Sequence, residues 1–256
     1  SIPLIIKEYC KQHSIKNFVI SSSGNAAIVA AETIIKHNQN NPDDTITLKI
    51  FVGPKIETAK LKNLQTLLQV DANISIKQVA NPKQSAFQVD KTKKAKLLRQ
   101  STDDLALKGY AELAEALNKI PNLAAIFIPT SSGTTAQALG EWFIKMNKPV
   151  QIHIAQTLAC HPMVNEITSS SEQSLAKAIV DKIAWRKNMV QKIIKETHGA
   201  GWIINNEELK AAKELVKRIT NIDISYNSAL SVAALIQATQ NNRTFVGAVV
   251  CLITGR

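Results

Sequence analysis

Cysteines, aromatic residues and long hydrophobic runs are scarce in this sequence. The three cysteines, Cys10, Cys160 and Cys251, are widely separated, and they are too few for a disulfide framework or a cysteine-based zinc site. This use of cysteine favours a reducing, cytoplasmic compartment. The longest apolar run, residues 245–253, has the length of a strand and is far shorter than the ~20 residues of a membrane helix. No basic segment followed by an apolar one marks a secretion signal.

Metal-ligand and nucleophile motifs are also missing. The five histidines are scattered, and none forms a His-Glu-x-x-His pair or another metal-ligand spacing. No Gly-x-Ser-x-Gly nucleophile elbow is present. We therefore expect no bound metal.

A strong positive charge is present instead. The 256 residues include 31 Lys and Arg against 20 Asp and Glu, a net charge of +11. The one basic cluster, between Lys91 and Arg99, has no interleaved aromatic residues, and aromatics make up only 5% of the chain. Few platforms for stacking bases are available, so we expect no nucleic-acid partner. A basic chain suits an anionic small-molecule ligand such as a phosphate.

Short apolar segments of strand period alternate with longer segments of helical period along the whole chain. With 45% hydrophobic residues, this order predicts an α/β protein with right-handed βαβ units and parallel sheets covered on both faces. The polar, lysine-rich stretch 80–100 is a candidate mobile subdomain or boundary, which predicts an N-terminal domain over 1–100 and a C-terminal domain over 101–256. We predict strands over 18–20, 46–52, 74–79, 124–128, 150–154, 202–204 and 246–253, and helices over 2–13, 26–35, 57–69, 104–118, 134–146, 173–196, 206–218 and 228–239.

Two hydroxyl-rich loops follow predicted strands and open predicted helices. The first is Ser21–Asn25 (Ser-Ser-Ser-Gly-Asn) and the second is Thr130–Thr135 (Thr-Ser-Ser-Gly-Thr-Thr). Open α/β sheets bind ligands at the carboxyl ends of strands, and the N–H groups at a helix start attract a carboxylate or phosphate. Each loop alone is also explained as a plain helix cap, but the repetition favours an anion site. A third strand end, Thr254-Gly255, says little by itself.

Together these three strand ends resemble the fold-type II pyridoxal-phosphate enzymes, also called the tryptophan synthase β-like family. That family includes threonine synthase, serine and threonine dehydratases, cysteine synthase and cystathionine β-synthase. Phe51-Val52-Gly53-Pro54, followed by Lys60, resembles the family's strand ending in Val-Pro with a lysine in the next helix. The resemblance is collinear over nearly the whole chain and includes the segments Gly109–Glu115, Ser228–Leu235 and Val249–Gly255. It implies two doubly wound parallel-sheet domains with the cofactor in the cleft between them.

The resemblance also implies site residues. The first loop would bind the substrate carboxylate, and Asn25 would also contact the cofactor, pyridoxal 5′-phosphate. The second loop would bind the cofactor phosphate, although it is poorer in glycine than is usual in the family. Thr254 would lie at the pyridine nitrogen. The implied residues are Ser22, Ser23 and Asn25 for the substrate carboxylate, and Gly24, Asn25, Ser131, Ser132, Gly133, Thr134, Thr135 and Thr254 for the cofactor.

The family's Schiff-base lysine has no counterpart at its expected place. In the family it lies in a Gly-Ser-x-Lys-x-Arg stretch well before the Asn of the first loop, and counting back from Asn25 passes the first residue, Ser1. Lys7 is not in such a motif. We therefore expect a fragment cut at both ends, with the catalytic lysine upstream of Ser1. Without that lysine we expect weak cofactor binding and no turnover.

The loop Ser-Ser-Gly-Asn-Ala-Ala and the Thr-Gly ending look most like threonine synthase, which converts O-phosphohomoserine to threonine and phosphate. A serine/threonine dehydratase (ammonia-lyase) and a β-replacement enzyme like cysteine synthase are the alternatives within the family. A non-catalytic protein that binds the cofactor or an amino acid without the lysine is an alternative of another class, and a generic doubly wound domain is the third. The expected partner is a small-molecule amino acid, and because family members are often dimers, a homodimer is an expectation as well.

Overall fold

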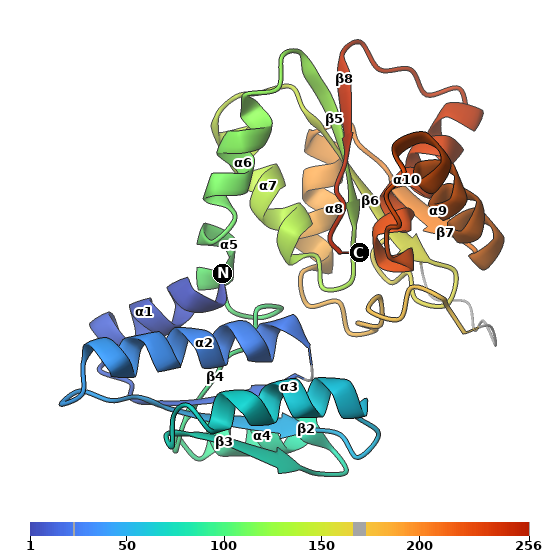
Figure 1. The fold of residues 1–256 in the computed structure, drawn as a ribbon. Helices are drawn as coiled ribbons and strands as arrows, with labels where there is room; N and C mark the ends of the chain where they lie inside the picture. The colour runs from blue at the N-terminus through green and yellow to red at the C-terminus, as the bar shows by residue number, and fades with distance from the viewer. Residues whose placement is uncertain (23, 166–172, 256) are drawn as a thin grey trace. The chain divides into compact units, whose positions relative to one another are not determined.

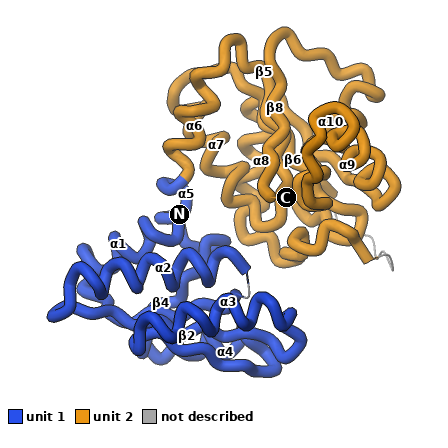
Figure 2. Tube along the Cα trace, viewed as in Figure 1, with its two compact units in different colours: residues 1–109 blue, residues 110–256 orange. Residues whose placement is uncertain are grey.

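The computed structural model describes residues 1–22, 24–165 and 173–255 (Figure 1). Ser23, one of the predicted site residues, lies outside this described part. The chain forms two compact units, Ser1–Gly109 and Tyr110–Arg256 (Figure 2). Each unit has its own four-stranded parallel sheet, so the predicted α/β class is confirmed. In the described ranges, no helix is both long enough and apolar enough to span a membrane.

Unit 1 has the strand order β3-β2-β1-β4. Its central strand β1 is buried from Phe18 to Ile20, as expected where helices cover both faces of a parallel sheet. Helices α1, α2 and α3 pack against Phe18 and Ile20 on one face, and α4 packs through Ala86 against Val19 on the other. The elements are α1 (Ile2–His13), β1 (Asn17–Ser21), α2 (Asn25–Asn40), β2 (Thr47–Val52), α3 (Thr58–Leu68), β3 (Ile74–Gln78), α4 (Pro82–Lys91), β4 (Lys96–Leu97) and α5 (Leu105–Lys108).

Unit 2 has the strand order β7-β6-β5-β8. Its central strand β5 carries Ile126 and Ile128 on the face covered by α6, α7 and α8. Ala125 and Phe127 lie on the opposite face, which α9 and α10 cover. The elements are α6 (Ala111–Asn118), β5 (Leu123–Pro129), α7 (Thr134–Lys145), β6 (Gln151–Thr157), α8 (Lys187–Glu196), β7 (Gly201–Ile204), α9 (Asn206–Thr220), α10 (Tyr226–Gln240) and β8 (Ala248–Cys251).

The two sheets share one topology. In each unit the first strand is central and pairs with the next strand on one side and with the last strand on the other. The direction of the crossovers therefore reverses beside β1 in unit 1 and beside β5 in unit 2. Such switch points are where open α/β sheets bind ligands. They are also the strand ends that carry the two hydroxyl-rich loops.

The helix predicted over 173–196 is wrong in its first half. Helix α8 begins only at Lys187, and the described residues before it form turns. Side chains of distant elements accept backbone N–H groups of this segment: the Ala178 N–H, for example, donates to Asn227 Oδ1 at 3.0 Å. Local periodicity does not reveal acceptors that lie far away in the sequence, which is why the pattern overestimated the helix.

The helix predicted over 104–118 is two helices, α5 and α6. Gly109 separates them, and a Cβ atom at Gly109 would lie only 2.5 Å from the Cα atom of Ser1. The close approach of these two backbone segments therefore requires glycine at this position. Helix α5 packs with α1 in unit 1, so unit 1 extends to Gly109, whereas the sequence placed the division at residue 100.

The lysine-rich stretch 80–100 belongs to unit 1 and is neither a boundary nor a subdomain of its own. It forms α4 and the two-residue strand β4, which pairs with β1. Ala86 is fully buried, and Asp90 Oδ1 accepts the Leu97 N–H at 2.9 Å. The exposed lysines dominate the composition of the stretch, so they conceal its few core positions.

The last strand is shorter than the predicted range 246–253. Strand β8 begins at Ala248, because Val246 is 98% exposed and Gly247 has a φ of 143° that breaks the extended backbone. It ends at Cys251, which leaves Thr254 in the segment after the strand.

A histidine is fully buried in unit 2. His153 Nδ1 accepts the indole N–H of Trp202 at 3.1 Å, and His153 Nε2 lies 3.1 Å from Gln151 Oε1. Since the indole only donates, Nε2 must carry the single ring proton and donate to Gln151. The ring also stacks on Phe127 at 4.4 Å between centroids. Burial, together with the nearby Arg243 guanidinium, lowers the pKa of His153 to about 4.

We predict a loss of stability in acid that depends on His153. Its pKa is lower in the folded chain than the 6.5 of a free histidine, so the unfolded chain binds more protons between these values. The free energy of unfolding should therefore fall as the pH drops from about 6.5 to about 4, by about 3 kcal/mol in total. Urea titrations across this range measure it. His153→Gln should flatten the pH dependence, whereas His13→Gln, an exposed control, should not; equal slopes in all three proteins would contradict the prediction.

Candidate functional site

The loop after β5 is held firmly where it begins. Thr130 is buried; its N–H donates to the Ala155 carbonyl at 2.9 Å, and its Oγ1 donates to the Ile128 carbonyl at 2.9 Å. Its own carbonyl accepts the side-chain amide of Gln156 at 3.2 Å. Thr130 is thus a structural anchor that ties the end of β5 to β6, and Ser131 and Ser132 after it are half-buried.

Gly133 sets the shape of the loop. Its φ is +84°, a left-handed conformation that favours glycine. A Cβ atom here would lie 2.9 Å from both Met163 Cε and Val190 Cγ2. Gly133 is also the N-cap of α7, whose first residue is Thr134. The backbone N–H groups in the first turn of an α-helix have no acceptor within the helix, so this turn can offer donors to an anion.

Hydroxyl groups line the same loop. Ser131 Oγ accepts the backbone N–H groups of Val180 and Asp181 at 3.2 and 3.3 Å. Because both bonds use the oxygen as an acceptor, the hydroxyl hydrogen of Ser131 can be donated to an anion. Ser132 Oγ lies 3.0 Å from Thr134 Oγ1. The loop therefore combines hydroxyl donors with the start of a helix.

A buried cation lies beneath the first turn of α7. The Arg186 guanidinium is 6% exposed and donates to Gln137 Oε1 at 2.8 Å. Gln137 Nε2 donates in turn to Glu141 Oε1 at 2.7 Å. Arg186, Gln137 and Glu141 thus form a hydrogen-bonded chain, and it is the positive end of the α7 dipole that favours an anion at the start of this helix.

Thr254 lies at the same edge of the sheet. Strands β5 and β8 are paired with Phe127 opposite Cys251, so Thr130 and Thr254 each lie three residues beyond that pair. Ser228, fully buried at the start of α10, holds the end of this segment: its Oγ accepts the Thr254 N–H at 3.1 Å and the Gly255 N–H at 3.0 Å. The structure therefore brings the second loop and Thr254 together at the switch point of unit 2.

The first loop lies at the switch point of unit 1. The Gly24 N–H donates to Ser22 Oγ at 3.2 Å, and the Gly24 carbonyl accepts the Ala27 N–H at 3.0 Å. Gly24 is the N-cap of α2 in an extended conformation, and Asn25 is the first, exposed residue of that helix. Of the predicted substrate-binding residues, Ser22 and Asn25 thus flank one helix start, and Ser23 lies outside the described residues.

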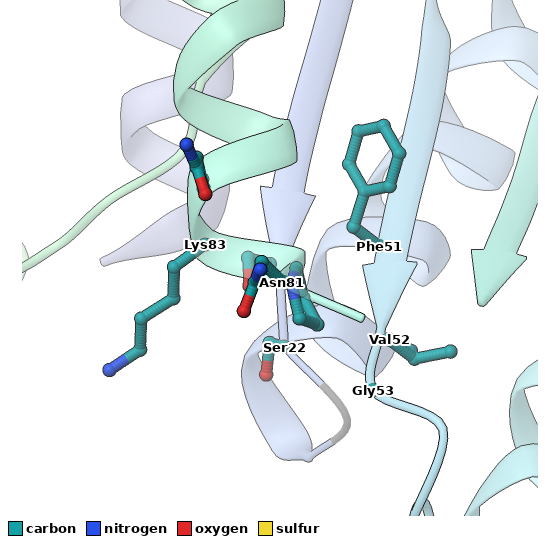
Figure 3. Close-up of a pocket in the computed structure, with 9 residues that line it drawn as sticks. Ser22, Phe51, Val52, Gly53, Asn81 and Lys83 are labelled. Atoms are coloured by element: carbon teal, nitrogen blue, oxygen red, sulfur yellow. The ribbon is translucent and has the colours of Figure 1, made fainter. Parts of the chain in front are cut away.

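A pocket of about 520 Å³ opens beside Ser22 at the carboxyl ends of β1 and β2 (Figure 3). The start of α4 forms part of its wall, which sequence reasoning did not include in the site. The family-like motif Phe51-Val52-Gly53 could have pointed to the wall at the end of β2. The wall at the start of α4 has no such signal in the sequence, because it depends on how α4 packs on the sheet. The lining residues are Ser21, Ser22, Phe51, Val52, Gly53, Asn81, Pro82, Lys83 and Gln84.

The unit 2 loop fits the phosphate of pyridoxal phosphate. A phosphate monoester requires several converging donors and a close approach to the backbone. The Ser131 hydroxyl and the N–H groups in the first turn of α7 supply donors, and the left-handed Gly133, whose Cβ position faces Met163 and Val190, sets the turn between them. At the same edge, Thr254 offers a neutral hydroxyl rather than a carboxylate.

Comparisons with known proteins point to a cofactor of the same kind. A family model described as pyridoxal-phosphate dependent enzyme matches residues 3–255. The search of curated proteins gave no match. Among solved structures, the chain is similar to the processed form of threonine deaminase isoform 2 from Solanum lycopersicum (TM-score 0.78, 14% identity, covering 99% of this chain and 73% of that one). It is also similar to serine racemase from Dictyostelium discoideum (TM-score 0.77, 16% identity, covering 100% of this chain and 81% of that one). A third similar structure is O-acetylserine dependent cystathionine β-synthase from Helicobacter pylori (TM-score 0.72, 16% identity, covering 98% of this chain and 79% of that one).

We predict that Gly133→Ala destabilises the protein by roughly 2–4 kcal/mol, because the added methyl group combines left-handed backbone strain with overpacking against Met163 and Val190. Gly24→Ala is the matched control. Gly24 is also a glycine N-cap, but its φ is −119° and nothing lies within 4 Å of its Cβ position, so its cost should stay below about 1 kcal/mol. Chemical denaturation measures both. Similar midpoints for the two variants would show that Gly133 is not required by packing.

Proposed function

Because the chain belongs to the family of pyridoxal-phosphate-dependent enzymes, we propose that it is a lyase of amino-acid metabolism that resembles threonine synthase. Family membership makes it an enzyme at the level of the family, with pyridoxal 5′-phosphate as the cofactor. The proposed reaction converts O-phosphohomoserine to threonine and phosphate. The observation that carries the proposal is the hydroxyl-rich loop at the β5–β8 switch point, with Gly133 at its turn and Thr254 at the same edge.

In this proposal the second loop holds the cofactor phosphate. The hydroxyl groups of Ser131 and Ser132 donate to phosphate oxygens, and the N–H groups of Gly133, Thr134 and Thr135 surround them. The positive end of the α7 dipole stabilises the negative charge. Ser131 also connects the phosphate to the segment before α8 through Val180 and Asp181.

Thr254 sets the electronic character of the cofactor ring in this proposal. A hydroxyl at the pyridine nitrogen leaves that nitrogen less protonated than a carboxylate does. When bound, the cofactor supplies an electron sink for the bonds at the substrate α-carbon. A less protonated ring suits elimination and replacement better than transamination. Ser228 supports this role because its hydroxyl accepts the Thr254 N–H and so fixes the backbone there.

The substrate carboxylate is assigned to the start of α2. Ser22 and Asn25 supply a hydroxyl and an amide at the amino end of a 16-residue helix, where backbone N–H groups favour a carboxylate. Ser23 is assigned the same role by family resemblance alone. Gly24 allows the backbone to approach the ligand closely, since its Cβ position is open.

Two other reactions remain within the same chemistry. A serine/threonine dehydratase would release ammonia and a 2-oxo acid, and a cysteine synthase-like enzyme would replace a β-substituent. A non-catalytic protein that binds the cofactor or an amino acid is the candidate of another class. Assays with a chain extended upstream of Ser1 to include a Gly-Ser-x-Lys-x-Arg stretch would separate them. Phosphate release from O-phosphohomoserine supports the synthase, ammonia from threonine supports the dehydratase, and no product from any substrate supports the binding protein.

We predict that Ser131→Ala lowers the affinity for pyridoxal phosphate by about 10-fold or more, because one hydrogen bond to a charged group is worth about 1.5–3 kcal/mol. Affinity for pyridoxal, which lacks the phosphate, should not change. Ser174→Ala is the control: its hydroxyl also accepts a backbone N–H, that of Ala176 at 3.1 Å, but it lies outside the loop. Absorbance and fluorescence titrations of the 256-residue chain give the constants. If the chain binds both compounds equally, the loop does not hold a phosphate.

A further inference from the structure

The pocket beside Ser22 has a distinct chemical character. Polar side chains occupy the side formed by β1 and the start of α4, where Figure 3 shows Ser22, Asn81 and Lys83. Across from them, at the end of β2, the Phe51 ring lies on the face of the sheet that α4 covers, whereas the Val52 side chain belongs to the opposite face. None of the nine described residues that line it is acidic. One side thus offers hydrogen-bond donors and a positive charge, and on the other side the Phe51 ring is the apolar group that methylene groups could contact.

Lys83 is the only cation among these described lining residues. It is exposed, and within residues 1–22, 24–165 and 173–255 no carboxylate forms an ion pair with it. By contrast, Lys16 and Lys60 in the same unit pair with Asp44 and Glu57. The ammonium group of Lys83 is therefore available for an anionic ligand, and its flexible stem allows it to adjust to one.

The charge of unit 1 also favours an anion. Residues 1–109 contain 16 Lys and Arg against 9 Asp and Glu, a net charge of +7. An excess of one sign raises the local concentration of oppositely charged ligands around a cleft. A phosphate ester has three free oxygens that accept hydrogen bonds. Besides Ser22, which is assigned to the substrate carboxylate, the pocket lining offers the Ser21 hydroxyl, two side-chain amides and the Lys83 ammonium group as donors to these oxygens.

We propose that this pocket is the subsite for the side chain of the amino-acid substrate, that it takes a side chain ending in a phosphate ester, and that Lys83 determines this specificity. The proposal rests on the proposed function, because it assigns Ser22 and Asn25 to the substrate carboxylate. Ser22 belongs both to that loop and to the pocket wall. A substrate whose carboxylate lies at the start of α2 would therefore extend its side chain toward Asn81 and Lys83, with its methylene groups along Phe51.

The test compares O-phospho-L-homoserine with L-homoserine, which differ only in the phosphate. Calorimetric titration of the 256-residue chain in phosphate-free buffer gives the two dissociation constants. We expect the phosphorylated compound to bind at least about 10-fold more tightly, which corresponds to about 1.4 kcal/mol. Lys83→Met should abolish this preference and Lys83→Arg should keep it. Lys36→Met, which removes an exposed lysine of α2 outside the pocket, is the matched control and should leave the preference unchanged.

Amide NMR shifts of the labelled chain locate the phosphate. Binding in the pocket should shift the signals of Ser22, Gly53 and Gln84. Shifts confined to the loop of Gly133 would place the phosphate at the cofactor site and overturn the proposal. It is also overturned if the two compounds bind equally, or if Lys83→Met and Lys36→Met have the same effect.

The outcome can be separated from a failure of the proposed function. Titration with pyridoxal phosphate tests the cofactor loop of unit 2 in the same preparations. If the chain binds pyridoxal phosphate through Ser131 but shows no preference that depends on Lys83, the specificity inference fails and the cofactor assignment stands. If pyridoxal phosphate does not bind, the proposed function fails. Because Lys83 is exposed, its substitution should leave the unfolding midpoint unchanged, which denaturation of each variant verifies.

Discussion

Both units depend on one constraint, the parallel pairing of a central strand with two strands that arrive from opposite directions. β1 lies between β2 and β4, and β5 lies between β6 and β8. Parallel strands need crossover connections, so the connecting helices pass over the two faces of each sheet. Where the direction of the crossovers reverses, the loops at the carboxyl edge diverge and leave a crevice between them. The two hydroxyl-rich loops follow these central strands. The place of the candidate site is thus a consequence of strand order.

The residues that pack against the second loop determine its shape and which hydrogen-bond donors it can offer to a ligand. Met163 and Val190 approach Gly133 so closely that only a residue without Cβ fits. Val180 and Asp181 use the oxygen of Ser131 as their acceptor and leave its hydrogen to donate. The same contacts stabilise the fold and orient the donors, so a ligand anion would meet a preorganised loop and lose less free energy to ordering.

The charged groups of the chain are arranged so that those in the interior are neutral or hydrogen-bonded and unpaired ones lie at the surface. The interior of unit 2 keeps His153 neutral between Phe127 and Trp202, and its buried Arg186 is hydrogen-bonded to Gln137 beneath the first turn of α7. Unpaired basic groups such as Lys83 lie at the surface of unit 1, where water solvates them at little cost. The positive charge is therefore available to ligands without weakening either core, in keeping with a chain that binds a phosphorylated cofactor.

The sequence by itself determined the alternation of strands and helices, the parallel α/β class and the positions of the Ser22–Asn25 and Ser131–Thr135 loops. These features depend on local periodicity and turn chemistry, and both are determined by residues that are neighbours in the sequence. Only the tertiary structure decided that residues 173–186 are not helical, that the chain breaks at Gly109, and that Asn81 and Lys83 share a pocket with Ser22. Each of these results depends on partners that are distant in sequence. Local pattern does not encode such contacts, because they form only when the crossovers bring separate elements together.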